Sequence, residues 1–434
     1  MRQASSIFNS KAKRVASIVL AFVMLVSGIW FLNRVFLRDS SRYKYKPFLE
    51  EDTDYDVLFF GTSHVINGIF PMQLWKDYGI TSYNFGGHAN SIAAAYWSMV
   101  NAVEIHKPKV AVLDVLGAGS QSAAMDISYA HLSFDAFPLS LNKIRAASDI
   151  FSEDSQSRNE LILPLSIYHN RWTELSSDMV KAGFGESGAS REKGAESRIA
   201  VAEPAKMRRI DETEMLTEET VGLQYIRKFI EYCRAEDIEP VLINIPFPEA
   251  EDSQKAANAA MALAKEEGVP AINFQYLDLV DFDTDCYDPN SHLNPSGARK
   301  VTDYLGSFLK KEYALSDHRE DSAYSELWDQ DYADYRDFLK ENIQNNTDLK
   351  VELMLLNNEN FTGELYLNER YQLDEVEEKL IEQLEDTVTV KYVSMLRGNA
   401  GKIMDVKLNI RDADSGELLV ERMYGMNETL TLAE

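Results

Sequence analysis

From Tyr55 onward the sequence alternates short apolar runs with amphipathic stretches, and this alternation constrains the fold more than any other feature. The apolar runs have the length of strands and cover residues 57–60, 82–85, 110–113, 241–245 and 271–274. Helical patterns cover about residues 91–106, 218–235 and 249–267, and Gly268 ends the last one, as glycine often does. Apolar strands separated by amphipathic helices indicate a parallel sheet covered on both faces. We therefore expect an α/β protein.

Two regions depart from this alternation. Residues 118–215 mix aromatics, serines and short charged clusters, which predicts a cap or lid inserted into a domain that spans residues 53–315. Beyond it, an acidic, tyrosine-rich helix is expected at residues 320–341 and a charged helix at 373–384. Strand-like runs accompany these helices at residues 351–356, 361–367, 388–395, 404–410 and 418–423. We expect residues 320–434 to form a separate small α+β domain of unknown role.

An uncharged apolar run near the N-terminus predicts a membrane anchor. Residues 15–32 form a run of 18 residues without a charge. This length is near the lower limit for a bilayer-spanning helix, which needs about 20 residues. Trp30 and Phe31 stand at its far end, where aromatic belts lie. No small-residue cleavage pattern follows, so we expect an uncleaved transmembrane helix over residues 15–36 and a linker over residues 37–52. A buried core helix is the alternative.

Basic residues flank this run on both sides and do not decide its orientation. They are Arg2, Lys11, Lys13 and Arg14 before it and Arg34, Arg38, Arg42, Lys44 and Lys46 after it. A tail of 14 residues is easily kept in the cytoplasm, whereas a long acidic domain is translocated largely regardless of its charge. We therefore expect a single-pass protein of the cell membrane, with residues 1–14 in the cytoplasm and the main domains outside.

The composition excludes several classes of protein. Asp and Glu total 70 against 44 Lys and Arg, a net charge of −26, and such a surface repels nucleic-acid phosphates. Two cysteines, Cys233 and Cys286, are too few for a cysteine-rich zinc module or a disulfide scaffold, although they could be two thiols or one disulfide. No His/Asp cluster has metal-ligand spacing, so we expect neither a metal nor another cofactor.

Two distant segments carry the residue types of a nucleophilic serine site. Gly61-Thr62-Ser63-His64 directly follows the first strand, which places Ser63 at the carboxyl edge of the sheet, where open α/β sheets bind ligands. His292 lies just before a helix whose start Asn294-Pro295 marks, and Asp288 precedes it by four residues. A nucleophilic serine needs a base, and the base needs a third group to fix its tautomer. Ser63, His292 and Asp288 could fill these roles, although plain loops would explain both segments too.

A third segment, residues 84–90, follows the second strand and contains Gly86 and Gly87. Glycines at such a place let backbone N–H groups approach a ligand, as an oxyanion hole requires. The N–H groups of Ser63 and Gly86 would then hold the oxyanion. A plain strand-to-helix turn explains the two glycines equally well.

In this order, a serine block, a glycine block and a histidine block resemble the SGNH (GDSL-type) hydrolase superfamily. The chain is similar to its membrane-anchored cell-envelope branch, which includes alginate O-acetylation proteins and the D-alanyl-transfer protein of teichoic acid modification. There, the serine motif resembles residues 61–64, the histidine lies in a segment like His292-Leu293-Asn294, and residues 168–172 also have a similar counterpart. The resemblance covers about residues 53–314. It implies a three-layer, flavodoxin-like SGNH hydrolase fold.

The chain departs from the family pattern at two places. The family aspartate usually stands three residues before the histidine, where this chain has Pro289, so Asp288 is one position early and Asp285 is a weaker candidate. The oxyanion asparagine of a Gly-x-Asn-Asp block after the third strand is also absent, and Asn90 is the candidate substitute.

Three further residues are candidate substrate contacts. His64, beside the serine, is expected to be a structural or substrate-contact residue rather than the base. His169 and Arg171 could contact a substrate or a carboxylate, or belong to a packed Tyr-Trp cluster.

The resemblance implies an esterase or O-acyltransferase that works through an acyl-serine intermediate on a cell-envelope polysaccharide or glycolipid. It also implies a multispanning membrane O-acyltransferase as a partner. The alternative is a catalytically inactive envelope protein that serves as a glycan-binding or assembly subunit. The shifted aspartate and the missing asparagine favour this alternative, whereas the intact Ser63 and His292 blocks oppose it. The acyl group and the acceptor stay open.

Overall fold

The computed structural model describes residues 2–184, 191–202, 207–289, 292–384, 387–398, 401–425 and 428–431. Its first sheet has five parallel strands: β1 (Val57–Gly61), β2 (Ser82–Gly86), β3 (Val110–Asp114), β4 (Glu239–Asn244) and β5 (Ala271–Asn273). Their order is β2-β1-β3-β4-β5, which is a common order in doubly wound sheets. The predicted parallel α/β sheet is confirmed.

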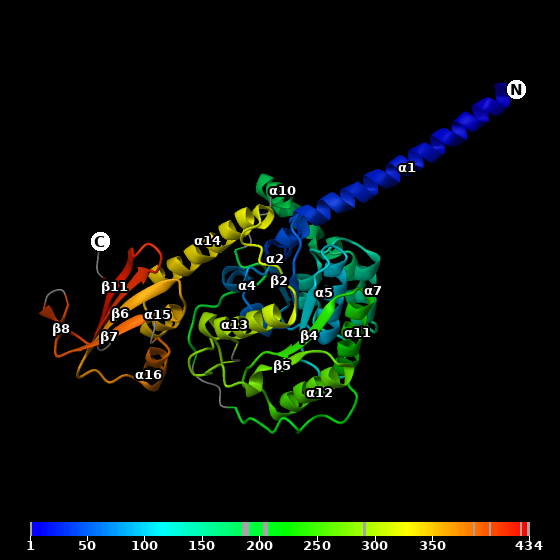
Figure 1. The fold of residues 1–434 in the computed structure, drawn as a ribbon. Coiled ribbons are helices and arrows are strands. Elements are labelled where there is room, and N and C mark those ends of the chain that lie inside the picture. Colours follow the sequence, from blue (N-terminus) through cyan, green and yellow to red (C-terminus); the bar gives the residue numbers. More distant parts are fainter. Residues whose placement is uncertain are drawn as a thin grey trace.

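Helices cover both faces of this sheet. They are α3 (Ser63–Gly68), α4 (Pro71–Tyr78), α5 (Ile92–Val103), α11 (Val221–Ala235), α12 (Glu251–Glu267) and α13 (Pro295–Glu312). Figure 1 shows α13 on one side of β4 and β5, and α11 and α12 on the other. Because neighbouring strand residues point to opposite faces, Phe59 and Val112 enter one core cluster and Phe60 and Leu113 the other. The three predicted helices are confirmed. The predicted helix end at Gly268 is confirmed too, and this glycine has a left-handed backbone conformation.

The N-terminal helix α1 (Arg2–Phe36) projects away from the rest of the molecule (Figure 1). Its part from Lys11 to Phe36 is long and apolar enough to cross a membrane, and none of its most apolar window is buried. The predicted linker over residues 37–52 is wrong, because a second helix, α2 (Asp39–Glu50), follows after two residues. Its Tyr45 and Phe48 are fully buried, and the Phe48 ring lies 4.6 Å from that of Phe85.

The insertion is mostly helical, with α6 (Ile127–Phe134), α7 (Leu141–Ile150), α8 (Ser155–Ile162), α9 (Leu165–Tyr168), η1 (His169–Glu174) and α10 (Ser177–Phe184). Of these, α7 packs against α5, whereas α9, η1 and α10 contact α1, as Figure 1 shows for α10. Residues 191–202 instead run beside the sheet: Asn84 N–H donates to Lys193 O at 2.9 Å, and Ala202 N–H to Cys286 O at 2.9 Å. Among the described residues of the insertion, this stretch lies close to the sheet, whereas α9, η1 and α10 lie at the end of α1.

The C-terminal region begins with the predicted helix, α14 (Ser322–Asn345). It then holds α15 (Leu349–Leu356), β6 (Phe361–Asn368), α16 (Glu375–Glu382), β7 (Val388–Val393), β8 (Leu396–Arg397), β9 (Ile403–Met404), β10 (Val406–Asp412), β11 (Leu418–Gly425) and β12 (Glu428–Thr431). A second sheet has the order β12-β11-β10-β6-β7. The strand predicted at residues 351–356 is wrong, since it lies in α15, capped by Asp348. A short run buried on all sides carries no periodicity that separates helix from strand.

This region does not stand apart from the α/β part. Helix α14 packs along α4, where the fully buried Trp328 lies 5.4 Å from Trp75 between ring centres. The Lys193 ammonium lies over the Trp328 ring at 4.3 Å and pairs with Asp331 (2.6 Å) and Glu51 (2.8 Å). One continuous core cluster therefore joins the two regions, contrary to the expected separate domain.

Candidate active site

Ser63 occupies the first position of α3, directly after β1. The turn requires glycine at position 61, because a Cβ atom there would lie 2.5 Å from Val65 Cγ2. Thr62 caps the helix, since its Oγ1 accepts a hydrogen bond from the N–H of His64 at 3.2 Å. The helix start therefore presents the Ser63 hydroxyl at the carboxyl edge of the sheet.

The structure brings Ser63, His292 and Asp288 together. His292 Nε2 lies 2.8 Å from Ser63 Oγ, and His292 Nδ1 lies 2.9 Å from Asp288 Oδ2. The second carboxylate oxygen of Asp288 accepts the backbone N–H of His292 at 3.1 Å. One carboxylate thus holds both the ring and the backbone of the histidine. This is the arrangement of a serine, a base and a group that orients the base.

The position of Asp288 follows from the shape of its loop. An isolated antiparallel β-bridge pairs the backbones of Cys286 and Leu293 at the two ends of the loop. Asp288 and His292 therefore face each other within it. Asp285, the weaker candidate, points elsewhere. Its carboxylate accepts hydrogen bonds from Ser296 Oγ at 2.8 Å and from Lys300 Nζ at 2.7 Å.

His64 packs directly against His292, the candidate base. Its ring lies 4.5 Å from that of His292 and 4.2 Å from that of Phe247. Burial, and secondarily the nearby His292, lower the pKa of His64 to about 3. The His64 ring is therefore neutral at physiological pH, and it adds no positive charge that would oppose protonation of His292.

The two expected oxyanion groups of the second loop are already engaged. The N–H of Gly86 donates to Asn84 Oδ1 at 2.9 Å, so it is not available to an oxyanion, contrary to the prediction. Gly86 instead makes room for α3, because a Cβ atom there would lie 2.7 Å from Thr62 O. Asn90 donates to Gly61 O at 3.3 Å and accepts from Ser133 Oγ at 2.9 Å.

The N–H of Ser63 itself is the candidate donor that fits the geometry. It lies at the start of a helix, where N–H groups have no partner within the helix. The next N–H, of His64, is taken by the Thr62 cap.

The predicted substrate contacts His169 and Arg171 lie at the end of α1 rather than beside Ser63. Arg171 Nη1 donates to the carbonyl oxygens of Phe36 at 2.6 Å and Leu37 at 3.2 Å. His169 is exposed, and its Nδ1 lies 2.7 Å from Ser166 O within its own turn. The structure therefore places neither side chain in the group formed by Ser63, His292 and Asp288.

Several neighbours of the site were not identified from the sequence. The ring of Tyr287 stacks on His292 at 5.6 Å. Nearby, Glu196 N–H donates to Ile66 O in α3, and the Glu196 carboxylate lies 3.4 Å from His88 Nε2. The hydrogen bond with His88 is the largest cause that lowers the pKa of Glu196 to about 2. Tyr287 could have been suspected from its place in the histidine loop, whereas nothing in the sequence places Glu196 near α3.

Beneath the site, two acidic side chains are buried at the carboxyl edge of the sheet. Asp114, at the end of β3, accepts the N–H of Ile245 at 3.2 Å, and burial raises its pKa to about 7. Glu249 accepts from Asn244 Nδ2 at 2.9 Å, and burial raises its pKa to about 8. Both carboxyl groups are therefore held largely protonated below neutral pH.

Comparison with known proteins adds no family assignment. No protein-family model matches the sequence, and the comparison with curated proteins finds no match. The assignment of a function therefore depends on the geometry of the residues described above.

Replacing Asp114 by asparagine should make the protein more stable at alkaline pH. Between pH 3.8 and about 7 the folded state still holds a proton on Asp114 that the unfolded state has already released, so this carboxyl lowers stability as pH rises through that range. Asp114→Asn should therefore raise the free energy of unfolding at pH 8 by roughly 1–4 kcal/mol and have little effect below pH 4.

Urea unfolding of the full chain at both pH values measures this difference. Glu153→Gln, which changes an exposed acid, is the matched control and should behave like the wild type. Equal losses of stability toward pH 8 in wild type and Asp114→Asn would show that folding does not raise the pKa of Asp114.

Proposed function

We propose that this protein is a membrane-anchored serine acyl-esterase or O-acyltransferase of the SGNH hydrolase type. The observation that carries the proposal is the hydrogen-bonded chain from Ser63 Oγ through His292 to Asp288. The strand order 2-1-3-4-5 and the placement of Ser63 at the carboxyl edge of the sheet support the same fold type.

In the proposed reaction, Ser63 Oγ attacks an ester carbonyl while His292 Nε2 takes its proton. Asp288 keeps Nδ1 protonated and stabilises the imidazolium that forms. The oxyanion receives a hydrogen bond from the Ser63 N–H. Collapse of the tetrahedral intermediate breaks the ester bond, and the departing alcohol takes the proton from His292. Water or a sugar hydroxyl then attacks the acyl-serine by the same steps, which frees Ser63.

The anchor supports a substrate of the cell envelope. With α1 in the cell membrane and its N-terminus in the cytoplasm, the site would lie outside the cell, where polysaccharides and glycolipids carry ester-linked acyl groups. A multispanning O-acyltransferase in the same membrane would be the partner that supplies those groups. These assignments follow from the resemblance stated above and from the exposed apolar surface of α1.

A second candidate function is a catalytically inactive glycan-binding or assembly subunit. The engaged N–H of Gly86 and the engaged side chain of Asn90 favour it, because they leave Ser63 N–H as the candidate oxyanion donor. Removing one such donor from a serine hydrolase typically costs a factor of about 10²–10³ in kcat.

Acyl-enzyme formation at Ser63 separates the two functions. The full chain in detergent, incubated with an activated aryl acetate, should release the aryl alcohol and gain an acetyl group by intact mass. Ser63→Ala should lose both signals because it lacks the nucleophile, whereas Ser148→Ala, which removes an exposed hydroxyl of α7, should keep them. Equal background behaviour of all three proteins would favour the binding subunit.

Asp288 and Asp285 should differ sharply when each is replaced. Asp288→Asn removes the group that orients His292, so kcat should fall by roughly 10²–10⁴-fold while KM changes little. Asp285→Asn leaves the contact between Asp288 and His292 in place, so its loss of kcat should be smaller than that of Asp288→Asn. The measurement is steady-state hydrolysis of the aryl ester, and a larger loss for Asp285→Asn would overturn the assignment of Asp288.

A further inference from the structure

The charges that border the apolar part of α1 set its depth in a bilayer. Arg14 and Arg34 are the nearest charged residues on either side, and 20 residues of helix span about 30 Å. This equals the thickness of a hydrocarbon core, about 30 Å. Arg34 therefore marks the boundary on the side of the folded domains, and Trp30 and Phe31 lie just within it.

A part of the insertion packs around α1 at this boundary. We call residues 165–184, which form α9, η1 and α10, the collar. The Phe184 ring stacks on Phe31 at 5.2 Å and meets Trp30 at 5.6 Å. Arg34 Nε donates to Gly183 O at 2.6 Å. The end of α10 therefore lies at the depth of the aromatic end of α1.

The collar exposes large apolar side chains. The exposed fractions are 67% for Trp172, 51% for Leu175 and 40% for Phe184. Trp172 lies beside the outer end of α1, because its neighbour Arg171 donates to Phe36 O. Trp at this level is typical of a membrane interface, where an apolar ring with a polar N–H is favoured.

The charges near the boundary also suit a lipid surface. Between Val15 and Lys46 the sequence has one acid, Asp39, against five basic residues. Residues 165–184 carry two basic and two acidic residues, whereas the whole chain has a net charge of −26. Glu50 adds a second acid at this level, since it pairs with Arg34 and Lys46, but the basic residues still outnumber the acids where anionic headgroups would lie.

We infer that the collar lies in the lipid headgroup region around α1, with Trp172, Leu175 and Phe184 facing lipid. A bilayer is favoured over a protein as the occupant, because Phe184 continues the exposed apolar surface of α1 through its contacts with Trp30 and Phe31. The inference rests on the proposed anchoring by α1.

Lipid-attached quenchers test this contact. A single cysteine at position 172, 175 or 392 would be labelled with a polarity-sensitive fluorophore in the full chain, at fewer than one chain per liposome. Tyr392→Cys is the matched control, since Tyr392 is 65% exposed on β7. Leu25→Cys, in the middle of the apolar part of α1, reports whether the anchor is inserted, through lipids that carry a quencher deep in the acyl chain. Cys233 and Cys286 are buried, and the unmodified chain gives their background labelling.

We expect Trp172→Cys and Leu175→Cys labels to be quenched by lipids that carry a headgroup-level quencher and to be shielded from iodide. The Tyr392→Cys label should show the opposite pattern. Quenching at position 25 together with iodide access at 172 and 175 would overturn the collar but keep the anchor, and would favour a protein partner for this surface. No lipid quenching at position 25 would overturn the anchor itself, and the collar with it.

An independent set of contacts joins the C-terminal region to the loop that carries Asp288 and His292. Gln383, which follows α16, donates from Nε2 to Thr284 Oγ1 at 2.9 Å. Its Oε1 accepts from Lys300 Nζ at 2.9 Å. Thr284 precedes the loop and Lys300 follows it in α13, so one side chain clamps both ends.

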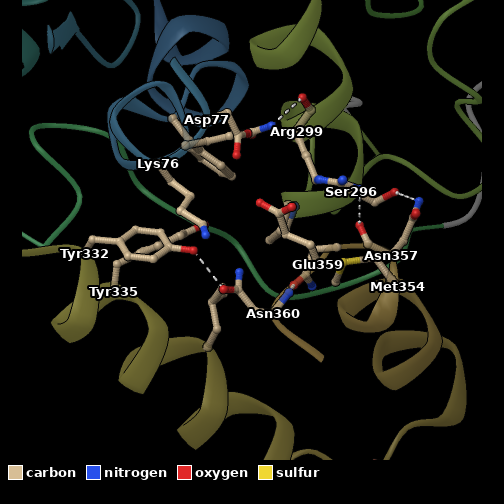
Figure 2. A pocket seen from close by; sticks show the side chains of 15 residues that line it. Lys76, Asp77, Ser296, Arg299, Tyr332, Tyr335, Met354, Asn357, Glu359 and Asn360 are labelled. Carbon is tan, nitrogen blue, oxygen red and sulfur yellow. Dashed lines mark hydrogen bonds between the residues drawn. The ribbon is translucent and has the colours of Figure 1, made fainter. Parts of the chain in front are cut away.

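Asn357 reinforces this contact. Its Nδ2 donates to Ser296 Oγ at 2.7 Å and to Gln383 Oε1 at 3.1 Å, and its carbonyl accepts from Arg299 at 3.3 Å. Figure 2 shows Asn357 facing Ser296 and Arg299 across the junction between α13 and the C-terminal region. We call the contacts of Gln383 and Asn357 with Thr284, Ser296 and Lys300 the clamp. Ser296 and Lys300 both bond Asp285, which therefore links the clamp to the loop.

We infer that Gln383 is a positioning residue, through which the C-terminal region fixes the histidine loop. This inference deepens the proposed function. Gln383→Ala should loosen the loop, lower kcat more than it changes KM, and shift the pH dependence of kcat. Gln383→Glu should restore most of the activity, because a carboxylate can still accept from Lys300 and from the Thr284 hydroxyl.

Two measurements on the full chain test whether Gln383 positions the histidine loop. The first is aryl-ester turnover, with Gln330→Ala, which changes an exposed glutamine of α14, as the control. The second is hydrogen exchange at Tyr287 N–H, which bonds His292 O at 2.9 Å. Faster exchange in Gln383→Ala alone supports the clamp even if the protein has no esterase activity, a result that would count against the proposed function only. Unchanged exchange would overturn the clamp.

Discussion

The buried ammonium of Lys193 is the contact on which the arrangement of the whole molecule depends. It joins Glu51, just after α2, to Asp331 in α14, and it covers the face of Trp328. The backbone carbonyl of Lys193 also accepts a hydrogen bond from the N–H of Asn84 in β2. Four regions that are distant in the sequence therefore meet at one residue, Lys193, which is 1% exposed. Because breaking a buried pair leaves an uncompensated charge, about 3–5 kcal/mol depends on this junction.

The sequence predicted the first sheet well because its strands are short, mostly apolar runs separated by helical patterns. It failed at α2 because the segment is rich in charge, and Tyr45 and Phe48, three residues apart, are too few to show an amphipathic period. It failed at residues 351–356 because a fully buried run looks alike as helix or strand. In both segments the structure is decided by packing against distant parts of the chain, which local pattern does not contain.

The candidate site was predictable where it depends on short motifs. Ser63, His292 and Asp288 were identified from their places at the end of a strand and before a helix, and the loop geometry favours Asp288 over Asp285. The Ser63 N–H was named from the sequence as an oxyanion donor, but the state of the Gly86 N–H was not predictable, because it is free or engaged according to the side chain of Asn84. The location of Arg171 depends on the path of an insertion with no repeating pattern.

The two-residue connection between α1 and α2 has a consequence for where this protein can act. Helix α2 leads straight to the sheet edge, where Lys44 Nζ donates to Gly86 O at 2.6 Å. If α1 is held in a bilayer, Ser63 then stays at a nearly constant height above the membrane, because the connection is too short to act as a flexible tether. For the proposed function, this would confine encounters with envelope polymers to a thin layer parallel to the membrane. The height of an acyl group within the envelope would then decide whether it is reached.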